Sequence, residues 1–487
     1  MTHHTRAATL LAQTPTGLFI DGAFRDGRGP GLDVEDPATG QVIARVADAD
    51  TDDAREALDA ACRAQAGWAA TPPRERGEVL RAAYELLVER TDDLALLMTL
   101  EMGKPLAESR GEVSYGAEFF RWFAEEAVRV RGSYAVAPAG GSRLLTMKKP
   151  VGPSLMITPW NFPLAMGTRK IGPALAAGCT AVLKPASATP LTSLALAQVL
   201  ADVGLPPGVV NVIPSSATAD VVPPLMADPR LRKVTFTGST QVGKGLIEAS
   251  AAGVLRVSME LGGNAPLLVF EDADLDVALE QTLLAKMRNI GEACTAANRL
   301  LVHAAVAPEF ARRLADAMGA LRVGPGVAED TEVGPLIDGR AVQSVREMVD
   351  EAVAGGARVL CGGGPVAGPG HFFAPTVLVD VPANARLGRE EIFGPVAPIT
   401  TFTTEEEALS RANDTEYGLM SYVFTKDLGR ALRVSEGLDY GMVGVNAGVV
   451  SNPAAPFGGV KQSGLGREGG AEGIEEFLET TYVGIRM

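Results

Sequence analysis

The sequence is poor in the residues that build disulfide frameworks, metal sites and membrane spans. Only four of its 487 residues are cysteines and four are histidines. Cys62, Cys179, Cys294 and Cys361 lie far apart and include no C-x-x-C pair. This spacing argues against a metal site and predicts a protein of the reducing cytoplasm. The N-terminus lacks an apolar signal segment, and no continuous apolar run is long enough to span a membrane.

Basic residues are outnumbered by acidic ones. Lysine and arginine total 44 against 59 aspartates and glutamates, which gives a formal charge of −15. Without a basic stripe, the chain is a poor partner for nucleic acid or for an anionic membrane surface. Hydrophobic residues make up 46% and charged residues 21%, as in ordinary globular α/β proteins. At about 100–200 residues per domain, the length predicts two to four domains.

Alternating strand and helix patterns predict a parallel sheet in the middle of the chain. Strand-like runs occupy 154–158, 180–184, 209–213, 233–237 and 254–259, with helical patterns between them. This alternation predicts a doubly wound sheet, because parallel strands need crossover connections.

The carboxyl ends of these strands predict where a ligand binds, since open α/β sheets hold ligands there. Trp160–Asn161 follows the first strand, Lys184–Ser187 the second and Gly238–Ser239 the fourth.

The segment before this sheet is predicted to be mostly helical. Residues 1–16 read as an irregular polar lead-in. Helical patterns follow at 51–68, 74–91 and 108–130, the first with Thr51 as its expected N-cap.

Two further units are expected. The strand and helix rhythm restarts after Glu260 and continues to about residue 446, which predicts a second α/β domain. Residues 132–150 read as a protruding hairpin around Gly140–Gly141. The strand-like tail 479–486 has no nearby partner in sequence and could pair with this hairpin, either within the subunit or across an interface.

Two glycine-rich motifs resemble nucleotide-binding loops. Gly464-x-Gly466-x-x-Gly469 follows no predicted strand and leaves no room for a βαβ unit, so a Rossmann turn is not expected there. GSTQVGKG (238–245) resembles a phosphate loop, but Gly245 stands where a magnesium-binding hydroxyl is needed. LLVFED (267–272) imitates the acidic strand of such ATPases, so a phosphate-loop ATPase stays open as an alternative.

Cys294 and Glu260 are the strongest candidates for chemistry. A free thiol with a pKa near 8.5 is mostly protonated at pH 7, so a cysteine nucleophile needs a nearby base or charge. His303, on a predicted strand, and His371, in a glycine-rich loop, are the internal histidines. Glu260, which leaves the fifth strand beside two glycines, is the better candidate base.

Seven ordered motifs resemble those of aldehyde dehydrogenases. They are PWNFP (159–163), LKPAS (183–187), FTGST (236–240), MELGGN (259–264), GEAC (291–294), EEIFGP (390–395) and PFGGVKQSGLGRE (456–468). The resemblance runs from about Asp21 to the C-terminus and is strongest to the succinate-semialdehyde dehydrogenase branch.

The resemblance implies an α/β aldehyde dehydrogenase fold in three parts. These parts are a Rossmann-type cofactor domain (1–131 and 151–259), a catalytic domain (260–446) and a small β oligomerisation arm (132–150 and 470–487). It also implies a homo-oligomer, either a dimer or a tetramer.

The resemblance assigns roles to three catalytic residues. Cys294 would attack the aldehyde carbonyl to give a thiohemiacetal. The Asn161 amide and the Cys294 backbone N–H would hold the oxyanion. After hydride transfer leaves a thioester, Glu260 would activate the water that hydrolyses it.

The resemblance also implies a dinucleotide site. Lys184 would contact the adenosine ribose and Gly238–Ser239 the pyrophosphate, while Glu391 and Phe393 would hold the nicotinamide ribose and ring, with Trp160 nearby.

Ser187 stands where NAD-preferring relatives commonly carry a glutamate. A carboxylate there would repel a 2′-phosphate, whereas serine is neutral and Lys184 is positively charged. We therefore expect NADP to be preferred, with NAD also used.

Arg169, Arg288 and Ser451 match positions that bind the substrate carboxylate in the succinate-semialdehyde branch. Arginine can grip a carboxylate in two places, and a four-carbon acid aldehyde needs a cation away from the nucleophile. A structural salt bridge or an ordinary surface position is the alternative for either arginine. Glutarate semialdehyde is the rival substrate, because one methylene alters pocket fit by only about 1–3 kcal/mol.

Two positions depart from the family pattern. Glu292 stands where glutamine is usual, and its carboxyl is expected to point away from Cys294. Ala296 replaces a second cysteine that some relatives carry, so a disulfide between such neighbours is unavailable.

Overall fold

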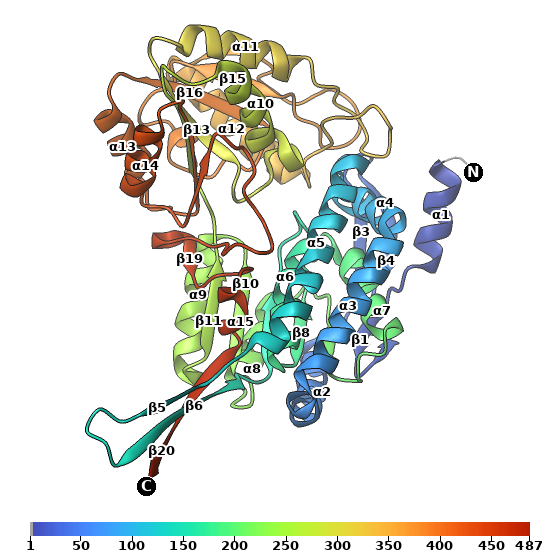
Figure 1. Cartoon of the computed structure of the whole chain (residues 1–487). Helices are drawn as coiled ribbons and strands as arrows, with labels where there is room; N and C mark the ends of the chain where they lie inside the picture. The colour runs from blue at the N-terminus through green and yellow to red at the C-terminus, as the bar shows by residue number, and fades with distance from the viewer. Residues whose placement is uncertain (1–2) are drawn as a thin grey trace.

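The computed structural model describes residues 3–487, which form two lobes and a thin projecting arm (Figure 1). Each lobe is built on one large β-sheet, and the arm is a separate three-stranded sheet. The carboxyl-terminal strand lies in the arm, where it pairs with a hairpin that is distant in the sequence (Figure 1).

The first sheet has eight strands in the order β19-β11-β10-β7-β8-β9-β1-β2. Its five central strands are parallel, as predicted. They are β7 (Ser154–Ile157), β8 (Ala181–Lys184), β9 (Val210–Val212), β10 (Lys233–Thr237) and β11 (Arg256–Glu260). Three antiparallel strands complete its edges, namely β1 (Leu18–Ile20), β2 (Ala23–Arg25) and β19 (Gly464–Leu465).

Crossover helices join the parallel strands, whose residues are nearly all buried because both faces of the sheet are covered. These helices are α6 (Ala165–Ala177), α7 (Pro190–Asp202), α8 (Thr218–Ala227) and α9 (Thr240–Ser250).

The N-terminal region contains more helix than predicted. The irregular lead-in predicted for residues 1–16 is wrong from His3 onward, because α1 (His3–Gln13) packs Ala7, Leu10 and Leu11 against the core; residues 1–2 lie outside the described residues. The other helices are α2 (Thr51–Ala70), α3 (Pro73–Glu89), α4 (Thr91–Met102), which the sequence patterns did not indicate, and α5 (Leu106–Glu126).

The expectation that Thr51 caps α2 is wrong, because Asp50 is the N-cap. Its carboxylate accepts the N–H groups of Asp52 and Asp53, and the Asp53 side chain returns the bond in a capping box. A carboxylate also interacts more strongly than a hydroxyl with the positive helix end.

The second sheet has seven strands in the order β14-β15-β16-β13-β12-β17-β18. All are parallel except β14. They are β12 (Ala265–Val269), β13 (Ala297–His303), β14 (Arg358–Cys361), β15 (Thr376–Val379), β16 (Val396–Phe402), β17 (Met420–Phe424) and β18 (Met442–Val445). The helices around it are α10 (Leu275–Met287), α11 (Ala307–Gly319), α12 (Gly339–Ala354), α13 (Glu405–Asn413) and α14 (Leu428–Gly437).

The arm confirms the predicted pairing of the tail with the hairpin. β20 (Leu478–Arg486) runs antiparallel to β6 (Ser142–Pro150), which pairs on its other side with β5 (Ser133–Val136). Two smaller elements lie outside the sheets described above: the hairpin of β3 (Leu32–Asp36) and β4 (Gln41–Val46), and the short helix α15 (Glu472–Glu475).

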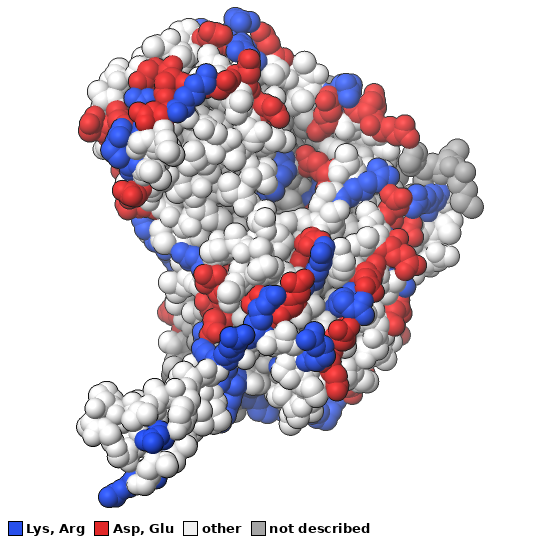
Figure 2. All heavy atoms as spheres, in the orientation of Figure 1, with Lys and Arg blue, Asp and Glu red and all other residues white. Residues whose placement is uncertain are grey.

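The division into a cofactor domain, a catalytic domain and an arm, with the boundaries predicted from the sequence, remains a proposal. On the face shown in Figure 2, acidic and basic side chains intermingle over both lobes, whereas the arm is mostly uncharged. Within residues 3–487, no helix combines the length and the apolar character needed to cross a bilayer.

Candidate active site

A pocket of about 230 Å³ lies where the first sheet meets the second lobe. Since water occupies about 30 Å³ per molecule in the liquid, this space suits a small organic molecule. It lies beyond the carboxyl ends of β7, β10 and β11, where the strand rule places a ligand. The structure brings together here every predicted site residue except Lys184 and Ser187: Asn161, Trp160, Arg169, Gly238, Ser239, Glu260, Arg288, Cys294, Glu391, Phe393 and Ser451.

Cys294 reaches the pocket from a tight loop between α10 and β13. The chain leaves α10 through a 3₁₀ turn, η3 (Arg288–Gly291), whose last three residues all have positive φ. A Cβ on Gly291 would lie 2.3 Å from the carbonyl oxygen of Gly394, so a residue with a side chain does not fit. The turn holds the half-buried thiol at the pocket wall.

Glu260 is the last residue of β11 and faces the same thiol. The chain then passes directly beneath Cys294, since a Cβ on Gly263 would lie 2.3 Å from the Cys294 carbonyl oxygen. Burial raises the pKa of Glu260 to about 7, and the Arg169 guanidinium opposes this rise. Burial and the Glu260 carboxylate raise the pKa of Cys294 well above its usual value. The pair therefore has a base poised near neutral pH beside a protonated thiol.

Asn161 follows β7 and supplies an amide to the pocket. Its side chain is buried, and its Nδ2 donates to the backbone carbonyl of Glu292 at 2.9 Å. Because the amide nitrogen carries a second N–H, one donor remains for an oxygen bound in the pocket. This geometry suits an oxyanion-stabilising role.

The Glu292 side chain points away from the thiol, which confirms that expectation. Its Oε1 accepts the N–H of Ile337 at 3.1 Å, and burial raises its pKa well above the usual value. A neutral carboxyl can occupy this site much as glutamine would, so the departure from the family pattern leaves the nucleophile loop intact.

Glu391 and Phe393 line the pocket opposite the strand ends. Burial raises the pKa of Glu391 to about 8, and its Oε1 accepts the Gly263 N–H at 3.1 Å. Phe393 has a φ of 50°, which is unusual for an aromatic residue, and packs edge-to-face on Trp160 with centroids 5.5 Å apart.

Lys184 and Ser187 lie outside this pocket, at the end of the neighbouring strand β8. Lys184 is buried, its Nζ donates to the Pro185 carbonyl at 3.2 Å, and burial lowers its pKa to about 8. Ser187 is exposed just beyond it.

The residues at the strand ends suit a dinucleotide. The buried hydroxyls of Thr158 and Thr237, after β7 and at the end of β10, have no hydrogen-bond partner within residues 3–487. Ser239 is the N-cap of α9, but its side chain caps no helical N–H. These free polar groups lie at the strand ends and at the N-terminus of α9, where they can bind phosphate and ribose oxygens.

Arg169 is fully buried and interacts with acidic neighbours. Its Nε and the Lys170 Nζ both bond the Glu468 carboxylate, and its guanidinium stacks 4.0 Å from the Phe457 ring centre. Its NH2 lies 3.9 Å from the Glu260 carboxylate and has no hydrogen-bond partner among the described residues. This placement favours the structural role left open for Arg169, with one N–H still available toward the pocket.

Arg288 is placed differently. Its guanidinium lies 5.2 Å from the Phe162 ring centre and forms no ion pair with any residue in 3–487. Ser451 lines the same wall. An unpaired arginine beside a hydroxyl is a suitable anchor for a substrate carboxylate.

Several residues around the site were missed by sequence reasoning. Glu468 pairs with Arg169, while Lys104, Glu108 and Glu112 bond the loops that carry Asn161 and Cys294. Tyr115 lines the pocket from α5. Glu108, Glu112 and Tyr115 lie in a predicted helix, and Lys104 and Glu468 lie in loops; no local pattern marks any of them as part of a site.

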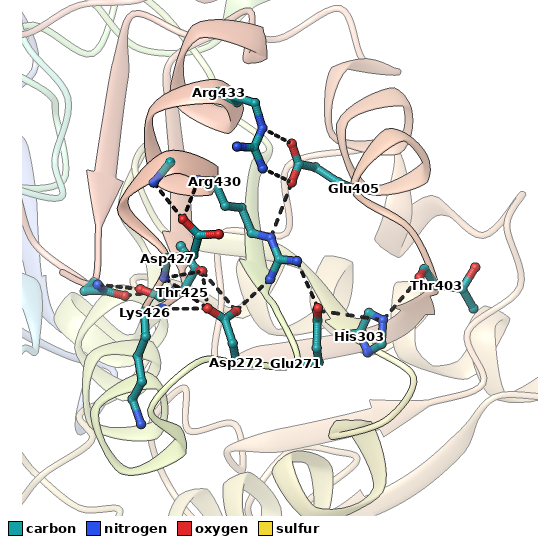
Figure 3. A network of polar contacts seen from close by, with 12 residues as sticks. Glu271, Asp272, His303, Thr403, Glu405, Thr425, Lys426, Asp427, Arg430 and Arg433 are labelled. Carbon is teal, nitrogen blue, oxygen red and sulfur yellow. Dashed lines mark hydrogen bonds and ion pairs between the residues drawn. The ribbon is translucent and has the colours of Figure 1, made fainter.

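The nucleotide-loop alternatives lose their support. Lys244 donates to Gln462 Oε1 at 2.7 Å, and Gly464 opens a strand that is antiparallel to β11. The acids of the LLVFED segment are also occupied, because Arg430 pairs with both Glu271 and Asp272 in a network at the carboxyl end of the second sheet (Figure 3).

Comparison with known proteins agrees with this geometry. Residues 24–483 match the family described as "Aldehyde dehydrogenase family". A succinate-semialdehyde dehydrogenase of Paenarthrobacter nicotinovorans is 60% identical over 91% of this chain and 99% of its own length. A glutarate-semialdehyde dehydrogenase of Pseudomonas putida is 49% identical over 96% of this chain and 97% of its own length.

Solved structures also resemble this chain closely. A crystal structure of an NADP-dependent enzyme from E. coli superimposes with a TM-score of 0.96 at 49% identity and covers 99% of both chains. Both the sequence match and the pocket that joins Cys294, Glu260 and Asn161 lead to one conclusion: the chain belongs to the aldehyde dehydrogenase family.

Proposed function

We propose that this protein oxidises succinate semialdehyde to succinate with NAD(P), by way of a thiohemiacetal and a thioester on Cys294. The observation that carries the proposal is the unpaired guanidinium of Arg288 in the same pocket as Cys294 and Glu260. The high identity to a succinate-semialdehyde dehydrogenase supports the same substrate.

The residues of the pocket can carry out the steps in order. The Cys294 thiol gives up its proton to water, its sulfur bonds the aldehyde carbon, and the carbonyl electrons move onto oxygen. The Asn161 amide and the Cys294 N–H stabilise that oxyanion. A nicotinamide cofactor held in the site would accept the hydride from the thiohemiacetal carbon. As that C–H bond breaks, the oxyanion electrons re-form the carbonyl and leave a thioester on Cys294. Glu260 takes a proton from water, the water oxygen attacks the thioester, and the thiolate leaves.

The residues proposed to hold the cofactor are those predicted from the sequence. Gly238 and Ser239 at the start of α9 would bind the pyrophosphate, and Glu391 and Phe393 would hold the nicotinamide ribose and ring near Trp160. Lys184 would contact the adenosine ribose. The neutral Ser187 beside Lys184 favours NADP, in keeping with the NADP-dependent E. coli structure, and NAD remains usable.

Replacing Ser187 with glutamate should shift the cofactor preference from NADP toward NAD by roughly 10- to 100-fold in kcat/KM. A carboxylate at this exposed position would repel the 2′-phosphate and accept ribose hydroxyls. Steady-state kinetics with both cofactors measures the shift. Ser187→Gln, which adds bulk without charge, should keep the NADP preference; the same shift in both variants would contradict the argument.

Replacing Arg288 with methionine should raise KM for succinate semialdehyde about 10- to 100-fold, because hydrogen bonds to charged groups contribute about 1.5–3 kcal/mol. The KM for butanal, which has no carboxylate, should change little. Arg312→Met serves as a control, since that side chain is 67% exposed and pairs with Asp316 on its own helix. Equal losses on both aldehydes would count against Arg288 as the carboxylate anchor.

Glutarate semialdehyde is the alternative substrate, supported by the P. putida relative at 49% identity. One extra methylene changes binding by only about 1–3 kcal/mol, so an anchor at Arg288 can serve both chain lengths. A panel of C4 and C5 semialdehydes, ranked by kcat/KM, decides between them.

The arm is proposed to join copies of this chain into a dimer or tetramer in the cytoplasm. It exposes Tyr134 (65%), Val136 (57%), Tyr482 (61%) and Ile485 (41%), which are costly to leave in water. Sedimentation velocity should show an oligomer that Tyr134→Asp combined with Tyr482→Asp converts to smaller species. An unchanged sedimentation coefficient would exclude the arm as the contact.

A further inference from the structure

Two glutamates on one face of α5 bond the two loops that carry the catalytic groups. Glu108 and Glu112 are four residues apart, so both side chains lie on the same side of the helix, one turn from each other. Glu112 bonds the loop after β7, and Glu108 bonds the loop before Cys294. The two loops come from different lobes.

Glu112 holds the Asn161 loop at two points. Its Oε1 accepts the N–H groups of Leu164 and Ala165 at 3.0 and 3.1 Å. Its Oε2 pairs with Lys104, whose Nζ donates to the Asn161 carbonyl at 2.7 Å. Both members of the pair are buried, at 1% side-chain exposure. The short segment from Asn161 to Ala165 is thereby fixed at both ends.

Glu108 holds the nucleophile loop. Its Oε2 accepts the Asn289 N–H at 2.6 Å, at a residue with a φ of 55° in the turn that leads to Cys294. Such backbone persists only where its surroundings enforce it. The side-chain Nδ2 of Asn289 in turn donates to the backbone carbonyls of Asn161, at 3.1 Å, and Glu292, at 2.9 Å.

The helix itself is anchored to the second lobe. The Leu106 N–H at the start of α5 donates to the Gly326 carbonyl at 2.9 Å. Burial raises the pKa of Glu108, while Lys104, the Asn289 N–H and Arg288 act in the opposite direction. The first turn of α5 therefore carries fixed contacts to both lobes.

We propose that Glu108 and Glu112 are positioning residues that set the distance between the Asn161 amide and the Cys294 thiol. The proposal rests on the proposed function, since it assigns the two glutamates to the oxyanion amide and the nucleophile, respectively. Glu112 acts through Asn161, and Glu108 acts through the turn before Cys294.

The first test is a double-mutant cycle between Glu112 and Asn161. Glu112→Gln keeps the shape of the side chain but loses the ion pair with Lys104, and it should lower kcat by about 10- to 100-fold. Asn161→Ala should lower kcat by about 10²- to 10³-fold. Both substitutions act on the Asn161 amide. Introducing Glu112→Gln into the Asn161→Ala variant should therefore lower kcat by less than about a further threefold. An equal loss in both backgrounds would overturn the proposal.

The second test measures how fast iodoacetamide alkylates Cys294, which needs neither substrate nor oxyanion contacts. Glu108→Ala should change this rate about 10-fold, and Glu108→Gln should restore it, because its amide oxygen can still accept the Asn289 N–H. Glu112→Gln should leave the rate within about twofold. If Glu108→Ala has no effect, or both glutamates alter alkylation alike, the proposal fails.

Controls separate this idea from misfolding and from failure of the proposed function. Glu118→Gln on the same helix, where Glu118 pairs with Arg121 near the surface, should change neither kcat nor alkylation. Melting temperatures identify any variant that does not fold, and the conservative glutamine variants then carry the test. If Asn161→Ala leaves kcat unchanged, the oxyanion role itself is wrong and the Glu112 proposal falls with it, whereas the alkylation test still decides the role of Glu108.

Discussion

Replacing Cys294 with serine should lower kcat for aldehyde oxidation by about 10⁴-fold or more. Serine is a far weaker nucleophile at neutral pH, and no thioester can form from it. Loss of a nucleophile in a preorganised site typically removes most of the rate enhancement. The formation of reduced cofactor, measured by absorbance with saturating substrate, gives the effect directly.

Cys361→Ser is the matched control. Cys361 is also a free, partly exposed thiol, but it lies on β14 at the edge of the second sheet and outside the pocket. Its replacement should leave kcat unchanged. If Cys294→Ser kept a tenth of the activity, covalent catalysis by this residue would be excluded.

Replacing Glu260 with glutamine should separate the two halves of the reaction. The thiol would lose the facing carboxylate that helps to raise its pKa, so attack on the aldehyde should continue. Thioester hydrolysis should slow by about 10²- to 10⁴-fold, because no base remains to activate water. The expected signature is a burst of about one reduced cofactor per active site, followed by a slow steady state.

Mass spectrometry of the quenched variant should find the succinyl group on Cys294. Glu248→Gln, an exposed substitution on α9, should turn over normally and accumulate no adduct. If the burst were lost together with the steady state, Glu260 would act in the first step rather than in hydrolysis.

Ionisation of Glu260 should set how the rate of acyl-enzyme hydrolysis depends on pH. Because the pKa of Glu260 is raised to about 7, the base is mainly protonated below that pH and mainly ionised above it. Hydrolysis of the acyl-enzyme should therefore accelerate as pH rises through 7 and then level off. In single-turnover experiments, Glu260→Gln should lack this rise; its persistence would assign the ionisation to another group.

The main features of the site could be predicted because the relevant patterns are local. Parallel strands are read from short apolar runs, and the residues that follow them must gather at one edge of the sheet. This rule predicts the positions of Asn161, Ser239 and Glu260. The motifs around Cys294 and Glu391 predict the part of the site that comes from the second lobe. Lys184 and Ser187 follow the same rule but lie on the next strand, beyond the pocket.

The remaining features depend on contacts between residues far apart in the sequence. Arg169 matches a substrate-binding position, yet its main partner is Glu468, 299 residues away, and no local pattern predicts that pair. Glu112 lies in the predicted helix 108–130, and Lys104 lies just before it. A charged residue in such a segment normally faces solvent. The choice between Asp50 and Thr51 as N-cap was also undecidable by residue type, since both are good caps.

The Arg169–Lys170–Glu468 cluster has a consequence for the order of folding. Two cations of α6 are buried, and their shared carboxylate comes from a segment that follows nearly the whole second lobe. Closing so long a loop is entropically costly, and contacts of such separation form late. During refolding, recovery of helix content should therefore precede recovery of catalytic turnover, because the interior charges of α6 stay uncompensated until the C-terminal segment docks.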